Sequence, residues 1–227
     1  AGIDADIYVP ADAKQSKLDA IEAAGATAVR VEGSRQDVTD ACVEEAVGGD
    51  AWYASHAWNP AFYAGTSTFA LELAAQRDWT VPDAVVLPLG HGTLFLGAYR
   101  GFRALAAAGW TDSVPRLLGV QATGVAPLVE KLHGPGEAGT NDVADGIQIR
   151  EPARREQILA AIEATDGDAI ACDAAATEAA LDDLHERGFY VEPTSAVAVA
   201  GLDAYRERGV LDSEDVVVGL TGSGLKK

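Results

Sequence analysis

A short glycine-containing turn is the part of this sequence whose residue types and spacing best suit chemistry. The turn consists of Gly90, His91, Gly92 and Thr93. It follows an apolar run at 84–87 and is followed directly by a helical pattern over 94–107. Two glycines between a strand and a helix expose backbone N–H groups at the positive end of the helix dipole, which suits a phosphate group. We predict a phosphate seat here, although the same pattern also fits a plain strand-to-helix turn.

The cysteines and histidines do not have the spacing of metal or redox sites. Cys42 and Cys172 stand alone, without a CxxC pair. The four histidines are scattered and form no HExxH motif; they are His56, His91, His133 and His185. We expect both cysteines to be buried free thiols, and we propose no metal site.

Short β-type runs and helical patterns alternate along the whole chain. We expect strands at 5–9, 27–31, 51–54, 84–87, 116–121, 168–171 and 215–219. We expect helices at 16–24, 36–47, 66–76, 94–107, 126–132, 153–164, 177–188 and 194–208, and an irregular stretch at 133–145. This alternation predicts an α/β fold with parallel sheets flanked by helices, divided near 57–60 into two such layers.

The charge of the chain limits its partners. The 35 acidic residues outnumber the 17 basic ones, which gives a net charge of −18. Nucleic acid and anionic membranes require concentrated Lys and Arg, so we expect neither as a partner. The excess of Asp, the many Ala and the few Lys resemble a salt-adapted proteome. No apolar run reaches the roughly 20 residues of a membrane span and no signal peptide opens the chain, so we expect a cytoplasmic protein of a halophile.

Five stretches resemble, in the same order, segments of threonine synthase and its relatives, the fold-type-II pyridoxal-phosphate enzymes. They are NPAFYAGTST at 59–68, VVLPLGHGTLFLGAYRGFRAL at 85–105, GVQA at 119–122, EPTSA at 192–196 and LTGSGLK at 220–226. Together they span most of the chain. The resemblance implies a tryptophan synthase β-like fold of two domains, with 1–58 as the remainder of a smaller N-terminal domain and 59–227 as a larger cofactor-binding domain.

The resemblance also implies roles for the turn and for one threonine near the end of the chain. Gly90, His91, Gly92 and Thr93 would hold the phosphate of pyridoxal phosphate, mostly by backbone N–H groups and with the Thr93 hydroxyl as an extra donor. His91 stands where relatives often have Asn. Thr221, in the LTG-x-GLK segment, would form a hydrogen bond with the pyridine nitrogen. A hydroxyl partner, unlike a carboxylate, leaves that nitrogen largely unprotonated.

None of the five matching segments contains a counterpart of the family's catalytic lysine. The Schiff-base lysine of the relatives lies upstream of the position that matches Ala1, and so does the Asn-containing loop that contacts the substrate carboxylate. The five lysines of this chain, Lys14, Lys17, Lys131, Lys226 and Lys227, lack the family's sequence context. We therefore expect an N-terminally incomplete enzyme that is inactive as this chain alone.

For the intact protein, the resemblance implies conversion of O-phosphohomoserine and water to threonine and phosphate. The substrate would be a small amino acid, and the family commonly forms homodimers. A threonine or serine dehydratase of the same fold is the nearest alternative, although its phosphate loop usually carries a glycine run where this chain has Gly-His-Gly-Thr. Cysteine synthase is a weaker third alternative. A non-catalytic homologue that binds pyridoxal phosphate remains open, because it would suit a chain without the lysine.

Overall fold

The computed structural model describes residues 2–136 and 139–225, and the chain forms two compact units, Ala1–Ser55 and His56–Lys227. The sequence predicts a boundary at residue 58, close to this division. The assignment of each unit to a domain of its own stays a prediction. Lys226 and Lys227, two of the five lysines compared above with the Schiff-base lysine of the family, lie outside the described residues.

The first unit is a βαβα arrangement, as its sequence pattern predicts. Strands β1 (Asp6–Pro10) and β2 (Thr27–Val31) pair in parallel, and helices α1 (Gln15–Ala23) and α2 (Arg35–Gly48) follow them. Helix α2 begins with a capping box, because the Ser34 hydroxyl accepts from the backbone of Asp37 while the Asp37 carboxylate accepts from the backbone of Ser34. The Ser34 hydroxyl also donates to the Asp37 carboxylate at 2.7 Å, and this bond, followed by the bond from the Ser34 backbone N–H, lowers the pKa of Asp37.

One local expectation about the chain around residue 60 is wrong, and one helix there was not expected. The stretch 51–54 is not a strand; Trp52 is 72% exposed and none of the ladders in the described residues includes this stretch. The helix expected at 66–76 is α4 (Thr68–Gln76), and the unexpected helix α3 (Pro60–Thr66) precedes it. Helix α3 begins where the Asn59 side chain accepts from the backbone N–H of Ala61 and Pro60 takes the first helical position.

The second unit is built on a parallel sheet of four strands. The strands are β3 (Ala84–Pro88), β4 (Arg116–Ala122), β5 (Asp168–Cys172) and β6 (Val216–Val218), in the order β5-β4-β3-β6. Strand β3 is buried along its whole length because it has a neighbour on each side and helices on both faces. All four strands run in the same direction, so their carboxyl ends meet at one edge.

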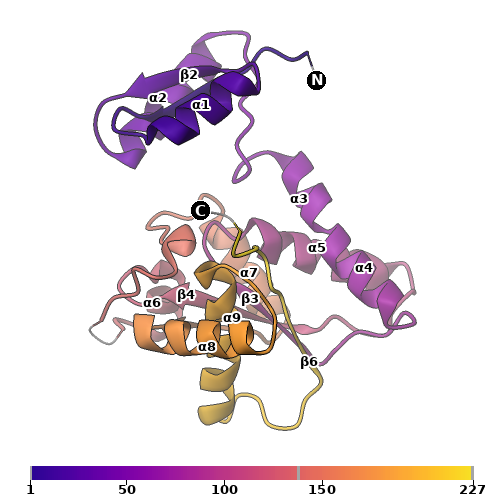
Figure 1. Cartoon of the computed structure of the whole chain (residues 1–227). Coiled ribbons are helices and arrows are strands. Elements are labelled where there is room, and N and C mark those ends of the chain that lie inside the picture. Colours follow the sequence, from indigo (N-terminus) through magenta and orange to yellow (C-terminus); the bar gives the residue numbers. More distant parts are fainter. Residues whose placement is uncertain (1, 137–138, 226–227) are drawn as a thin grey trace. The chain divides into compact units, whose positions relative to one another are not determined.

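Helices cover both faces of this sheet (Figure 1). They are α5 (Thr93–Ala107), α6 (Pro127–His133), α7 (Arg155–Ala164), α8 (Ala174–Glu186) and α9 (Pro193–Glu207), with a short 3-10 helix, η1 (Asp145–Ile147). Alternate residues of β3 point to opposite faces. Val86 packs in the core that includes α8 and α9, and Val85 packs in the core that includes α5 and α7.

Helix α5 approaches α3 and α4 closely through two glycines. A Cβ at Gly97 would lie 2.0 Å from Thr66 Oγ1, and a Cβ at Gly101 would lie 2.6 Å from the Ser67 carbonyl oxygen. Larger residues at these positions would force the helices apart. The close packing brings Thr66, at the end of α3, against the first residue of α5. Among the described residues, no helix is long and apolar enough to cross a membrane.

Candidate active site

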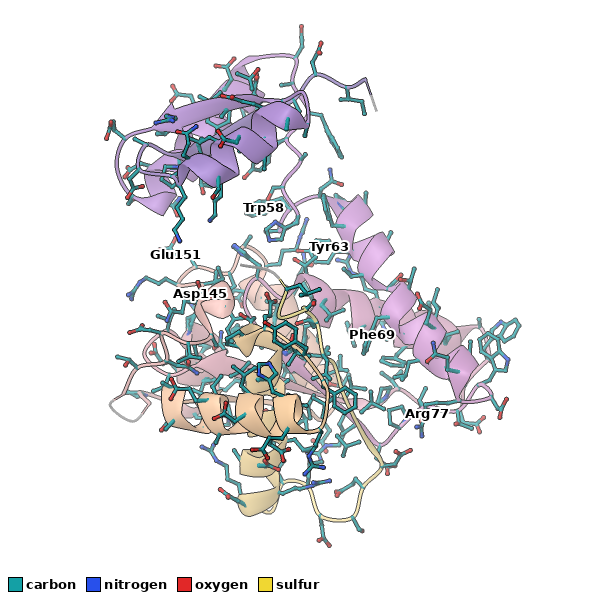
Figure 2. The ribbon with its side chains drawn as sticks, viewed as in Figure 1. Trp58, Tyr63, Phe69, Arg77, Asp145 and Glu151 are labelled. Carbon is teal, nitrogen blue, oxygen red and sulfur yellow. The ribbon has the colours of Figure 1, made fainter. Side chains whose placement is uncertain are left out.

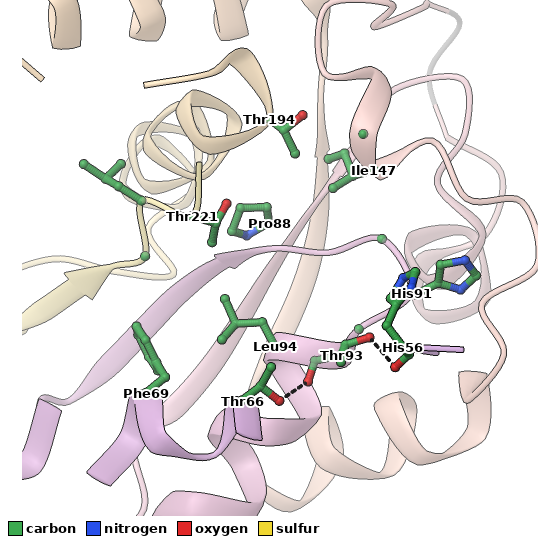
Figure 3. Close-up of a pocket in the computed structure, with 15 residues that line it drawn as sticks. His56, Thr66, Phe69, Pro88, His91, Thr93, Leu94, Ile147, Thr194 and Thr221 are labelled. Carbon is green, nitrogen blue, oxygen red and sulfur yellow. Dashed lines mark hydrogen bonds between the residues drawn. The ribbon is translucent and has the colours of Figure 1, made fainter. Parts of the chain in front are cut away.

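A cavity of about 600 Å³ lies at the carboxyl edge of the four-stranded sheet (Figure 3). Its wall includes the turn after β3, parts of α3 and α4, η1, the first turn of α9 and the segment after β6. Val86 of β3 pairs with Val218 of β6, so the segments that follow these two strands leave the sheet at neighbouring points. The strand register therefore brings the turn at 90–93 and the segment at 219–221 into one cavity.

The turn after β3 requires glycine at its last position before α5. Gly92 is the N-cap residue of α5 and has a φ of +74°, in the left-handed region. A Cβ at Gly92 would also lie 2.4 Å from Ile158 Cδ1, on α7. Backbone conformation and close packing against α7 thus both exclude a side chain here, and Gly92 lines the cavity through its backbone.

Three backbone N–H groups of this turn, those of Gly90, Gly92 and Thr93, have no acceptor among the described residues. The first N–H groups of a helix have no intrahelical partner, and the helix dipole places partial positive charge there. The turn therefore offers three donors to an anionic group, and none of the described residues that line the cavity carries a carboxylate.

The side chains of the turn have partners within the protein. The Thr93 hydroxyl donates to the His56 carbonyl at 3.3 Å, and the Thr66 hydroxyl donates to the Thr93 carbonyl at 2.9 Å (Figure 3). The rings of His56 and His91 meet edge to face, with centroids 5.4 Å apart. The backbone of the turn is therefore better placed than the Thr93 hydroxyl to bind an anion, because that hydroxyl is directed to His56.

The chain segment that carries His56 into the wall is fixed by aromatic and arginine contacts. The Tyr63 hydroxyl donates to the Ala57 carbonyl at 2.5 Å, and the Arg154 guanidinium donates to the Trp58 carbonyl. The same guanidinium lies over both rings, 5.4 Å from the Trp58 centroid and 5.1 Å from that of Tyr63. Figure 2 shows Trp58 and Tyr63 together at the start of α3.

The second wall is the segment after β6, which carries Thr221. Ser195, in the first turn of α9, is fully buried and lies against this segment. Its hydroxyl oxygen accepts from the backbone N–H of Thr221 at 3.0 Å and of Gly222 at 2.7 Å. The Glu192 backbone N–H donates to the Gly222 carbonyl at 3.1 Å. The start of α9 therefore holds Thr221 at the cavity.

A third wall comes from η1, which a buried asparagine holds in place. Asn141 is 1% exposed, and its side-chain amide donates to the Cys172 carbonyl at 2.8 Å and to the Thr177 hydroxyl at 2.9 Å. Its side-chain oxygen accepts from the Ala144 backbone at 3.1 Å. These bonds connect the irregular stretch before η1 to the end of β5, and so position Ile147 in the cavity wall.

The five residues predicted as binding residues all line this cavity; they are Gly90, His91, Gly92, Thr93 and Thr221. Their roles toward a cofactor stay predictions. Sequence reasoning assigned no role to His56, Thr66, Thr194 or Ser195. Thr66, Thr194 and Ser195 lie within the NPAFYAGTST and EPTSA segments that carry the family resemblance, so a signal for them was present.

Elsewhere, the cysteines are free thiols. Cys172 is buried, and burial raises the pKa of its thiol to about 11. Cys42 is only half-buried, so the expectation of burial is wrong for it. Among the described residues, no group of three or more His, Cys, Asp and Glu side chains could hold a metal ion.

The chain belongs to the family of pyridoxal-phosphate dependent enzymes, whose model matches residues 1–222. Several curated relatives of the chain are threonine synthases. It is 33% identical to threonine synthase of Methanosarcina acetivorans and 31% identical to that of Methanocaldococcus jannaschii, over 89% of this chain and 51% of each relative. It is 29% identical to threonine synthase of Mycobacterium bovis, over 100% of this chain and 62% of the relative.

The chain thus spans about half to three fifths of the length of the threonine synthases it matches. Solved structures show the same fold at lower identity. Threonine deaminase isoform 2 of Solanum lycopersicum matches with a TM-score of 0.76 and 22% identity, over 96% of this chain and 58% of that one. Maize serine racemase matches with a TM-score of 0.78 and 20% identity, over 98% and 67%.

Proposed function

We propose that this chain is the cofactor-holding part of a threonine synthase, which converts O-phosphohomoserine and water to threonine and phosphate. One observation carries the proposal: an amide-lined glycine turn and the Thr221 hydroxyl line one cavity, in a chain whose curated relatives are threonine synthases. The family is pyridoxal-phosphate dependent. The substrate and the reaction are inferred from the relatives, which are longer than this chain.

The turn fits the phosphate of the cofactor. The N–H groups of Gly90, Gly92 and Thr93, which have no acceptor among the described residues, supply donors at a helix N-terminus. The two imidazole rings of His56 and His91 border the same wall. Because an N–H donor does not lose its proton near neutral pH, this seat should hold an anion over a wide pH range.

The opposite wall fits the ring of the cofactor. Leu94, Ile147 and Phe69 give the cavity an apolar lining suited to an aromatic ring, and Thr221 adds one hydroxyl. Thr221 is exposed in the segment after β6 and lines the cavity. A hydroxyl is a suitable partner for a pyridine nitrogen that carries no proton.

When bound, pyridoxal phosphate supplies the electron sink that allows bonds at the substrate carbons to break. The residues of this chain would bind and orient: the turn would hold the phosphate, and the Thr221 hydroxyl would contact the ring nitrogen. Thr221 also sets how strongly the ring withdraws electrons, because a neutral hydroxyl does not protonate the nitrogen. None of the described residues that line the cavity is a lysine, so we assign binding and orienting roles, and no proton transfer, to these lining residues.

A binding titration tests the first part of the proposal. Pyridoxal phosphate should bind the purified chain at least about tenfold more tightly than pyridoxal, because a hydrogen bond to a charged group contributes about 1.5–3 kcal/mol. Quenching of tryptophan fluorescence and absorbance of the cofactor provide two independent readouts. Equal affinity for the two compounds would show that the turn does not hold the phosphate.

An activity assay tests the reaction. Incubation with O-phosphohomoserine and pyridoxal phosphate should release phosphate and form threonine in the enzyme that contains this chain. Ammonia release from threonine or serine without phosphate release would replace this proposal with a dehydratase. Cofactor binding without any turnover would favour a homologue that binds pyridoxal phosphate but is not catalytic.

A further inference from the structure

Ser195 forms a dense set of hydrogen bonds with the segment that carries Thr221. Its hydroxyl oxygen lies 3.0 Å from the Thr221 amide nitrogen and 2.7 Å from the Gly222 amide nitrogen. It also lies 3.2 Å from the Gly222 carbonyl oxygen and 3.3 Å from the Thr221 hydroxyl oxygen. The side chain is fully buried in the first turn of α9, so water does not compete for these bonds.

A count of lone pairs and protons decides which hydroxyl is the donor. A serine hydroxyl has two acceptor lone pairs and one proton. The amides of Thr221 and Gly222 occupy both lone pairs, because an N–H group can only donate. Ser195 therefore has no lone pair left to accept a proton from the Thr221 hydroxyl. Ser195 donates its own proton to the Gly222 carbonyl oxygen, to the Thr221 hydroxyl oxygen or to both at once.

We propose that Ser195 is a positioning residue that fixes the direction of the hydrogen bond made by Thr221, so that the Thr221 hydroxyl donates into the cavity. The Thr221 hydroxyl proton is excluded from Ser195, so it is available to an acceptor in the cavity. A group that accepts this proton is therefore favoured over a group that donates to a lone pair of the Thr221 hydroxyl. A protonated pyridine nitrogen, which is itself a donor, is disfavoured at this position.

This inference rests on the proposed function, because it concerns the ring nitrogen of bound pyridoxal phosphate. It assigns a role to a residue outside the cavity lining. Ser195 is not among the described residues that line the cavity, and it acts only through Thr221 and Gly222. Ser195 is separated from Thr221 by 26 residues along the sequence. The electronic state of the ring is thereby linked to the packing of α9 against the sheet.

The test uses pyridoxal phosphate labelled with 15N in the ring, bound to the full chain and followed by NMR. In the unsubstituted protein, the ring nitrogen should stay unprotonated to a lower pH than in the free cofactor in the same buffer. This measurement needs no variant to fold. A ring nitrogen that remains protonated to a higher pH than in the free cofactor would show that Thr221 is an acceptor, and would overturn the proposal.

Variants separate a positioning role from a merely structural one. Thr221→Val should move the 15N resonance toward that of a ring nitrogen without a hydrogen bond. Ser195→Ala should move it in the same direction and weaken binding roughly three- to tenfold, as expected for one disturbed hydrogen bond. In the double variant, Ser195→Ala should cause no further change in the resonance, because its effect passes through the Thr221 hydroxyl.

Thr165 provides a matched control. It is 7% exposed, its hydroxyl accepts from the Leu117 backbone at 3.3 Å and donates to the Ala161 carbonyl at 2.9 Å, and it does not line the cavity. Thr165→Val should lower the unfolding midpoint without moving the 15N resonance. If Ser195→Ala also left the resonance unchanged, the proposal for Ser195 would be wrong although cofactor binding stood. If the unsubstituted chain bound no cofactor, the proposed function would fail together with it.

Discussion

The two segments that face each other across the cavity are built in different ways. The turn at 90–93 follows β3 and leads directly into α5, and its donors are backbone N–H groups that any strand-to-helix turn of this shape would expose. The segment with Thr221 follows β6 and is held by Ser195 and Glu192, at the start of α9. One region depends on local conformation and the other on contacts between distant parts of the chain. We therefore expect the first to be sensitive to backbone changes and the second to side-chain changes.

The largest effect is expected from Gly92→Ala. The left-handed φ and the contact with Ile158 make a Cβ unfavourable, and residues held in such backbone regions cost about 1–3 kcal/mol of stability each. Affinity for pyridoxal phosphate should fall more than about tenfold, because two or more charged hydrogen bonds are disturbed. Affinity for pyridoxal should change much less.

Gly109→Ala is the matched control for this change. Gly109 has a φ of +73°, and a Cβ there would meet no atom within 4 Å. Urea unfolding should show a loss of stability from the backbone alone, with unchanged cofactor affinity. Equal losses of affinity in the two variants would mean that the turn is not the phosphate seat.

A smaller effect is expected from Thr221→Val. Thr221 is exposed, so we expect a stability change within about 0.5 kcal/mol. Affinity should fall roughly three- to tenfold, the effect of one hydrogen bond, and by the same factor for pyridoxal phosphate and pyridoxal. Thr221→Ser should restore most of the affinity. A loss confined to pyridoxal phosphate would contradict the assignment of Thr221 to the ring.

Salt should act on the two regions differently. The net charge of −18 repels an anionic cofactor over long distances, and about 1 M salt shortens the Debye length to roughly 3 Å. Affinity for pyridoxal phosphate should therefore rise from low to molar salt, while affinity for pyridoxal should change little. The thermal midpoint of the protein should also rise, as the prediction of a salt-adapted protein requires. An equal or lower midpoint at molar salt would contradict that prediction.

The smallest effect is expected from Thr93→Val. The hydrogen bond from its hydroxyl to the His56 carbonyl is long, at 3.3 Å, and should contribute at most about 1 kcal/mol to stability. Because the backbone of the turn supplies the donors, cofactor affinity should fall by less than about threefold. A loss as large as that of Gly92→Ala, measured in the same titration, would show that the hydroxyl itself binds the phosphate.

The same contrast explains what could be predicted from the sequence. Hydrophobic periodicity and the glycine spacing predict β3, the turn and α5, because all three depend on neighbouring residues. The resemblance to threonine synthases predicts Thr221, which lies at the cavity. The strand predicted at 51–54 failed because a strand needs a partner, and periodicity does not provide one. Helix α3 was missed although Asn59 and Pro60 form a recognisable helix start.

The residues that hold the walls could not be predicted in this way. Asn141 contacts Thr177, and Ser195 contacts Thr221, across separations of 36 and 26 residues. Neither pairing has a local pattern, because each depends on how α8 and α9 pack against the sheet. The resemblance of the EPTSA segment to threonine synthases indicates that this segment is part of the family pattern. Only the hydrogen bonds of the structure show that Ser195 holds the segment with Thr221.

Backbone amide chemical shifts test the central claim most directly. Two-dimensional 1H–15N NMR spectra of the chain should be recorded during titration with pyridoxal phosphate and, separately, with pyridoxal. We expect the amide resonances of Gly90, Gly92 and Thr93 to shift strongly with pyridoxal phosphate and weakly with pyridoxal, while that of Thr221 shifts with both. Shifts located elsewhere in the chain, with the turn unaffected by pyridoxal phosphate, would contradict the account.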